Sequence, residues 1–99
     1  MEKIKVIIFG IGEISQVAHH YLNEDERYEV FGFTMDHKFI NKDNFEGLPI
    51  IPFHLVEQTF PPDKFKLFIP LSYIQVNKLR EKKFIEASNK GYDFISYVH

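Results

Sequence analysis

The opening of the chain constrains its fold more than any other stretch, because it joins a buried strand, a glycine turn and a helix. Residues Ile4–Phe9 are apolar except for Lys5, a pattern typical of a parallel strand covered on both faces. Gly10, Gly12 and Ser15 follow in the spacing G-x-G-x-x-S. In such a turn the first glycine permits the bend and the second lets a ligand approach the backbone. A small third residue lets the helix pack on the strand.

The helix predicted over residues 13–22 has apolar residues at helical intervals. We expect them to form one face against the sheet: Ile14, Val17, Ala18, Tyr21 and Leu22. The turn before this helix directs free backbone N–H groups and the positive helix end toward one point, which suits a phosphate. The alternative is a tight turn that binds nothing. Glu13 favours this alternative, because its carboxylate would repel a pyrophosphate unless it faces solvent.

The rest of the chain alternates strands with helices. Strands are predicted at 28–34, 47–52, 65–69 and 93–98, and helices at 53–59 and 73–90, with a polar, irregular stretch at 35–46. The strand at 47–52 lies between prolines, which favours a sheet edge, and Gly32 indicates close approach of another backbone. The predicted fold is therefore α/β, a single small Rossmann-like domain of three layers with a mostly parallel sheet of four to five strands.

Composition excludes several classes of function. The net charge is −2 and the basic residues are scattered, which argues against a nucleic-acid partner. Cysteine is absent, so there is no disulfide and no thiolate metal site, which fits a cytoplasmic localisation. The apolar start is too short for a membrane span and lacks a small-residue cleavage site, so we expect no membrane partner.

Ligands of parallel sheets bind at the carboxyl ends of the strands, near the point where the strand order reverses. Asp36 follows the second strand, where an acid in dinucleotide folds bonds ribose hydroxyls, although an ordinary loop aspartate is the alternative. His37 lies in the same expected mouth and can donate to a phosphate or a base. Asn77 and Arg80 are an i, i+3 pair, and Arg80 can fork onto a phosphate or form a structural salt bridge.

Known catalytic patterns are missing from the sequence. It offers no Ser/His/Asp set, no paired carboxylates, no Walker loop and no His/Cys cluster with zinc spacing. We therefore predict no catalytic residue and no metal site. The motifs indicate a domain that binds a ligand.

Several segments together resemble the N-terminal domain of bacterial sugar O-/N-acyltransferases, the sialic-acid-O-acetyltransferase-like enzymes of the left-handed β-helix class. The resemblance covers nearly the whole chain and is carried by FGIGEISQVAHHYL, YEVFGFTMD, GLPIIPF, FIPLSYIQVNKLREKK and GYDFISYVH. It implies a role in surface polysaccharide synthesis. It also implies that residues 1–99 are a Rossmann-like domain that holds a UDP- or dTDP-sugar.

The resemblance also implies roles for single residues and for a missing domain. The residues that it places around the nucleotide-sugar are Gly10, Gly12, Ser15, Asp36, His37, Tyr73, Asn77 and Arg80. In this family a hexapeptide-repeat domain follows, forms a homotrimer, binds acetyl-CoA and carries the catalytic histidine. That domain is absent from this chain, so we expect no cofactor here and acetyl-CoA only in the full-length enzyme.

Three functions therefore compete at the level of sequence. The first is a nucleotide-sugar-binding domain of a sugar acetyltransferase. The second is a module that binds a mononucleotide or NAD as a sensor, which Asp36 favours. The third is a structural domain without a ligand, which Glu13 favours.

Overall fold

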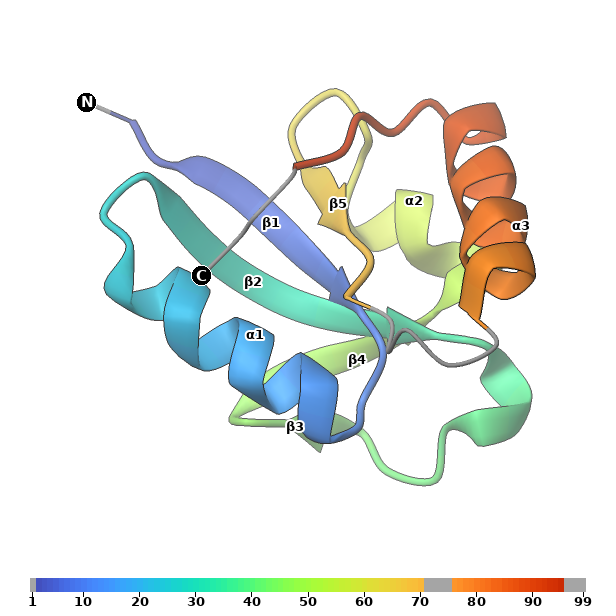
Figure 1. Ribbon diagram of the computed structural model, residues 1–99, viewed down its shortest axis with the longest axis horizontal. Coiled ribbons are helices and arrows are strands. Elements are labelled where there is room, and N and C mark those ends of the chain that lie inside the picture. Colours follow the sequence, from blue (N-terminus) through green and yellow to red (C-terminus); the bar gives the residue numbers. More distant parts are fainter. Residues whose placement is uncertain (1, 71–75, 96–99) are drawn as a thin grey trace.

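A computed structural model describes residues 2–70 and 76–95, and the side chains of 76–80 are left out of the description. Its sheet has five strands in the order β3-β4-β2-β1-β5 (Figure 1). β1 pairs in parallel with β2 and with β5, and β2 pairs in parallel with β4, whereas β3 is antiparallel to β4. The strands are β1 Ile4–Phe9, β2 Tyr28–Met35, β3 Asn44–Phe45, β4 Leu48–Pro52 and β5 Lys66–Phe68. The predicted α/β, Rossmann-like fold is confirmed.

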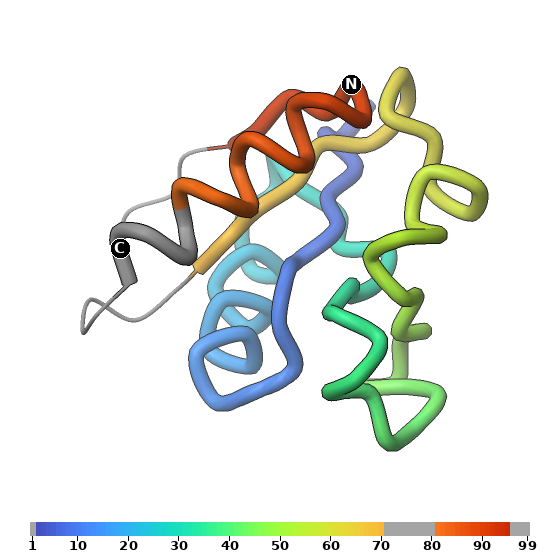
Figure 2. The backbone as a smooth tube through the Cα atoms, turned by 90° about the vertical axis from the view of Figure 1, so that its right-hand side faces the viewer, coloured from blue at the N-terminus to red at the C-terminus, as the bar shows by residue number. Residues whose placement is uncertain are grey.

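The helices cover both faces of this sheet. They are α1 Glu13–Glu24, α2 Val56–Thr59 and α3 Val76–Asn89, with the 3₁₀ turns η1 His37–Phe39 and η2 Phe53–Leu55. In Figure 1 the strands run between α1 and the pair α2–α3. Figure 2 looks onto the face that α2 and α3 share, where the segment from η1 to α2 and the helix α3 lie on either side of β1. The arrangement is the predicted three-layer domain.

β1 is the centre of both cores because its side chains alternate between the two faces. Val6 and Ile8 pack with Leu22 of α1, and Ile7 and Phe9 pack on the α2–α3 side. Each of these β1 side chains is at most 3% exposed. Burying one such side chain stabilises the fold by about 1.5–3 kcal/mol. The nearly continuous apolar run of the sequence thus corresponds to a strand covered on both faces, as predicted.

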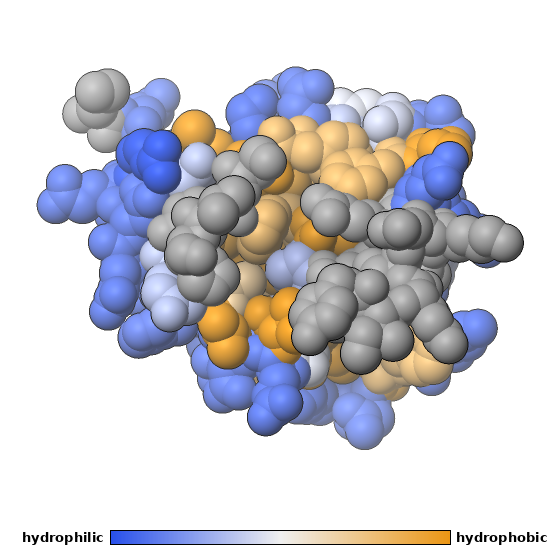
Figure 3. Space-filling view, viewed as in Figure 1, coloured by the Kyte–Doolittle hydropathy of each residue, from blue (hydrophilic) through white to orange (hydrophobic). Residues whose placement is uncertain are grey.

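The apolar face of α1 differs from the prediction. Its buried residues are Ser15, Ala18 and Leu22, while Ile14, Val17 and Tyr21 are 42%, 46% and 37% exposed. Figure 3 shows hydrophobic surface over α1 among hydrophilic residues. The sheet contacts only one stripe of the helix, so the predicted face of five apolar residues is wrong for these three.

Two predictions about the second and fourth strands have different outcomes. A Cβ placed on Gly32 would lie 3.0 Å from the carbonyl oxygen of Pro49, so the close backbone approach is confirmed. The strand predicted at 47–52 forms as β4, but β3 pairs outside it and forms the sheet edge. The polar stretch at 35–46 contains η1 and β3, and its irregular sequence did not predict either element.

The C-terminal part of the fold agrees with the sequence where it is described. α3 ends before Gly91, whose φ of +99° breaks the helix. The predicted strand at 93–98 begins as a parallel bridge between Leu67 and Phe94. The amide of Leu67 donates to the carbonyl of Asp93 at 2.9 Å, and the amide of Ile95 donates to that of Leu67 at 3.1 Å. Residues 96–98 of that strand lie outside the described residues.

Candidate functional site

The sheet topology brings the ends of three strands to one edge. The chain leaves β1 for β2 on one side, and β5 then pairs on the other side of β1, so the order reverses at β1. The amide of Gly10, just after β1, donates to the carbonyl of Thr34 in β2 at 2.8 Å. The glycine turn and the residues after β2 are therefore neighbours at the carboxyl edge, where ligands of such sheets bind.

The glycine turn has the geometry that its sequence predicts. Gly10 has a φ of +115°, and a Cβ there would lie 2.5 Å from the Oγ of Ser15. Both the conformation and the close contact require glycine at this position. Ser15 is 3% exposed, and its hydroxyl donates to the carbonyl of Phe9 at 3.4 Å. The Ser15 side chain therefore packs the helix on the strand, and only its backbone amide remains for a ligand.

The N-terminus of α1 is open at this turn. Gly12 is the N-cap and makes no side-chain cap, and a Cβ on Gly12 would meet nothing within 4 Å. The first amides of a helix need a partner that an N-cap side chain often supplies. Glu13 is exposed, so it does not fill this space with a buried carboxylate. The turn combines uncapped amides, the positive helix end and room for an anion.

Asp36 forms an ion pair with a lysine of α3. The Nζ of Lys83 donates to the Oδ1 of Asp36 at 2.5 Å and lies 3.1 Å from the Oε2 of Glu86. The side chain of Lys83 is 6% exposed, and its ammonium group lies over the rings of Phe9 and Phe53 at 5.3 and 4.7 Å. Burial alone would lower the pKa of Lys83, but the hydrogen bonds with Asp36 and Glu86 raise it above its ordinary value. Lys83 is therefore a buried charge that two carboxylates hold in place.

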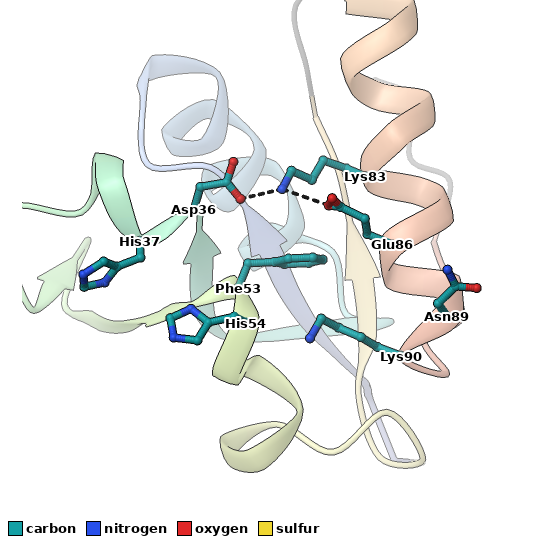
Figure 4. Close-up of a pocket in the computed structure, with 8 residues that line it drawn as sticks. All are labelled: Asp36, His37, Phe53, His54, Lys83, Glu86, Asn89 and Lys90. Carbon is teal, nitrogen blue, oxygen red and sulfur yellow. Dashed lines mark hydrogen bonds and ion pairs between the residues drawn. The ribbon is translucent and has the colours of Figure 1, made fainter.

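A hollow of about 440 Å³ lies between the end of β2, η2 and α3. Figure 4 shows its lining residues, which are Asp36, His37, Phe53, His54, Lys83, Glu86, Asn89 and Lys90. The rings of His37 and His54 meet edge to face with centroids 5.9 Å apart. At the other end, Lys90 donates to both carboxylate oxygens of Glu57 at 2.9 and 2.8 Å. Although burial raises the pKa of Glu57, these bonds lower it below its ordinary value.

The structure brings only some of the predicted site residues to the hollow. Asp36 and His37 line the hollow, and Gly10 and Gly12 lie at the same sheet edge without lining it. Tyr73 is outside the described residues. Asn77 and Arg80 lie on α3, and their side chains are outside the description.

Sequence reasoning missed the role of Lys83 beside Asp36. The i, i+3 spacing of Lys83 and Glu86 was a readable signal. The pairing with Asp36 was not readable, because 47 positions separate the two residues.

The described residues include neither a membrane-spanning helix nor a cluster of metal-binding side chains. No helix within 2–70 and 76–95 is long and apolar enough for a membrane span. In the same part of the chain, no group of three or more His, Asp or Glu side chains is placed to hold a metal ion.

Comparison with known proteins supports the fold. No protein-family model matches the chain, and no curated protein matches it. UDP-D-quinovosamine 4-dehydrogenase from Vibrio fischeri aligns with a TM-score of 0.69 and 20% identity over 90% of this chain and 72% of that one. The acetyltransferase domain of PglB from Neisseria gonorrhoeae, in complex with acetyl coenzyme A, aligns with a TM-score of 0.66 and 16% identity. This alignment covers 92% of this chain and 42% of that one.

A third structure, the C. glutamicum DAP dehydrogenase in complex with DAP, gives a TM-score of 0.61 and 18% identity over 84% of this chain and 25% of that one. This chain spans less than half of the PglB domain and a quarter of the DAP dehydrogenase. At these identities the likeness concerns the fold. What the chain shares with these three structures is the backbone architecture of a Rossmann-like α/β domain.

Proposed function

We propose that this chain is the nucleotide-sugar-binding domain of a sugar-modifying enzyme and that it holds a UDP- or dTDP-sugar at the carboxyl edge of its sheet. The observation that carries the proposal is the uncapped N-terminus of α1 at Gly12, which lies at the same carboxyl edge of the sheet as Asp36. Two similar structures add support, because one is named as a UDP-sugar dehydrogenase and the other as an acetyltransferase domain.

In this proposal different residues at the carboxyl edge bind different parts of the ligand. The amides after Gly12 and the positive end of α1 bind the diphosphate. Asp36 accepts hydrogen bonds from the ribose. His37, which is exposed at the mouth of the hollow, donates to a phosphate or the base. Tyr73, Asn77 and Arg80 remain proposed contacts through the resemblance alone.

The finer proposal is that the whole enzyme is a cytoplasmic sugar acetyltransferase. Acetyl-CoA and the trimer contacts would then belong to a hexapeptide-repeat domain, which the ninety-nine residues do not include. Residues 1–99 would position the sugar nucleotide, and a histidine elsewhere would activate the attacking hydroxyl or amine.

Thermal unfolding with and without a UDP-sugar tests this function. A ligand at a hundred times its Kd stabilises a domain by about 2.7 kcal/mol, which raises the Tm by roughly 10 °C or more. Gly12→Ala should leave the unliganded Tm nearly unchanged, because a Cβ there meets nothing. It should weaken binding about ten-fold, because the methyl group occupies the place where the phosphate approaches.

The control for this variant is Asn23→Ala, an exposed change in the last turn of α1. It should retain the full ligand-dependent shift. Equal binding by Gly12→Ala and the unchanged chain would exclude the glycine turn as the phosphate site. No shift with any UDP- or dTDP-sugar would leave the ligand-free structural domain as the better description.

A nucleotide sensor is the second candidate, because Asp36 follows β2 and two of the similar structures are dehydrogenases. A competition titration separates it from the first. If NAD displaces UDP and binds more tightly, the chain is a dinucleotide module. If UDP binds and NAD does not compete, the nucleotide-sugar function is favoured.

A further inference from the structure

The Asp36 carboxylate has two oxygen atoms in different environments. Oδ1 accepts the hydrogen bond from Lys83. Figure 4 shows that the other oxygen points away from the hollow and from Lys83. The Asp36 side chain is 30% exposed, so this second oxygen can receive a donor from outside. Asp36 therefore bonds the protein through one oxygen and turns the other away from Lys83 (Figure 4).

Lys83 holds this orientation without help from a ligand. Its ammonium group contacts Glu86 as well as Asp36, and the rings of Phe9 and Phe53 lie beneath it. Since the Lys83 side chain is 6% exposed, water competes little for these contacts. A carboxylate that is oriented before binding loses little conformational freedom when the ligand arrives.

We propose that Lys83 is a positioning residue that makes this site selective for ribonucleotides, so that UDP-linked ligands bind more tightly than dTDP-linked ones. This inference rests on the proposed function. The outward oxygen of Asp36 accepts hydrogen bonds from the 2′- and 3′-hydroxyls of a ribose. Hydrogen bonds to an ionised acceptor are the stronger kind, and a site arranged for a hydroxyl discriminates against the analogue that lacks it.

The positive charge of Lys83 has a second effect on the same ligand. A lone carboxylate beside the glycine turn would repel the diphosphate. The ammonium group 2.5 Å from Oδ1 offsets the Asp36 charge and leaves the outward oxygen as an acceptor. Lys83 thus lets an acid recognise the ribose of an anionic ligand.

Calorimetric titration with UDP, 2′-deoxy-UDP and dTDP tests the inference, because the first two differ only in the 2′-hydroxyl. The unchanged chain should bind UDP about ten-fold more tightly than 2′-deoxy-UDP and dTDP. Lys83→Met should bring the ratio of the UDP and 2′-deoxy-UDP dissociation constants close to one. A merely structural lysine would weaken both ligands equally and leave this ratio unchanged.

Lys90→Met is the matched control, since Lys90 lies over the same Phe53 ring at 5.2 Å but bonds Glu57. It should preserve the discrimination. Asp36→Asn serves as a second variant if Lys83→Met does not fold, and it too should lose the discrimination. This variant keeps the shape of the side chain. It replaces the ionised carboxylate, which accepts hydrogen bonds from the ribose hydroxyls, with a neutral amide.

The outcomes separate this inference from the proposed function. Equal binding of UDP and 2′-deoxy-UDP by the unchanged chain overturns the ribose selectivity and leaves nucleotide binding intact. A ratio that survives in Lys83→Met overturns the positioning role. Failure of all three nucleotides to bind overturns both the inference and the function on which it rests.

Discussion

Lys83 of α3 and Lys90, which directly follows α3, form similar ion pairs in different parts of the fold. Lys83 and Lys90 both lie over the ring of Phe53, at 4.7 and 5.2 Å, and each bonds a carboxylate distant in sequence. Lys83 bonds Asp36 at the carboxyl edge of the sheet. Lys90, which Figure 4 shows at the end of the hollow away from that edge, bonds Glu57 of α2.

The surroundings of the two ammonium groups differ in a way that predicts their importance. The Lys83 side chain is 6% exposed and has two carboxylate partners, whereas that of Lys90 is 19% exposed. A more deeply buried charge depends more on its partners, because water cannot replace them. We therefore expect Lys83 to matter for both stability and recognition, and Lys90 to matter modestly for stability.

The largest effect should come from Lys83→Met. It leaves Asp36 and Glu86 without their shared cation, and these carboxylates are only 30% and 35% exposed. Because that partial exposure allows some hydration, we expect a loss of about 2–3 kcal/mol in the free energy of unfolding. Urea denaturation measures it. A loss below about 0.5 kcal/mol would show that the pair is dispensable for the fold.

Lys90→Met should cost less. Glu57 is more accessible than Asp36, at 36% against 30%, so water can solvate it once the lysine is gone. We expect a loss of about 1 kcal/mol or less, again from urea denaturation. If Lys90→Met destabilised the chain more than Lys83→Met, burial would not be the property that separates the two lysines.

The smallest effects concern pH, and they act at opposite ends of the scale. The pKa of Lys83 is raised above its ordinary 10.5, so its contribution is present below pH 10.5 and is lost as the pH rises through the folded value. The pKa of Glu57 is lowered from 4.5, so its contribution is present above pH 4.5 and is lost as the pH falls through the folded value.

The difference between Lys83→Met and the unchanged chain should therefore shrink above about pH 10.5, and that for Lys90→Met should shrink below about pH 4.5. Tyr92, whose pKa burial raises, also destabilises the fold when it ionises. It is present in both proteins, so the comparison removes its effect. Unfolding curves at several pH values check this, and loss of the Lys83 difference at neutral pH would refute it.

Local sequence was a sound guide to the strand, turn and helix at the start of the chain. Gly10 adopts the positive φ and the close contact with Ser15 that its motif implies. Periodicity was less reliable for α1, because Ile14 and Val17 fit the apolar pattern as well as Ala18 does but lie outside the contact with the sheet. A helical pattern cannot state how wide a stripe the neighbouring layer will cover.

The candidate site could be predicted only in part. The order of elements placed Asp36 at the correct edge, since the carboxyl ends of parallel strands meet there. The hollow beside it also needs Phe53 of η2 and Lys83 of α3. Neither residue carries a motif, so its part in the site becomes visible only when the chain is folded.

The sequence by itself determined the α/β class, the buried first strand and the glycine turn, because these depend on side-chain periodicity and backbone conformation over a few residues. Only the tertiary structure decided which carboxylate Lys83 meets and which way Asp36 faces. Those contacts join residues 47 positions apart, because the fold brings Lys83 of α3 to the residue that follows β2. The role of the Lys83 ammonium group therefore depends on the carboxylates that tertiary packing places beside it.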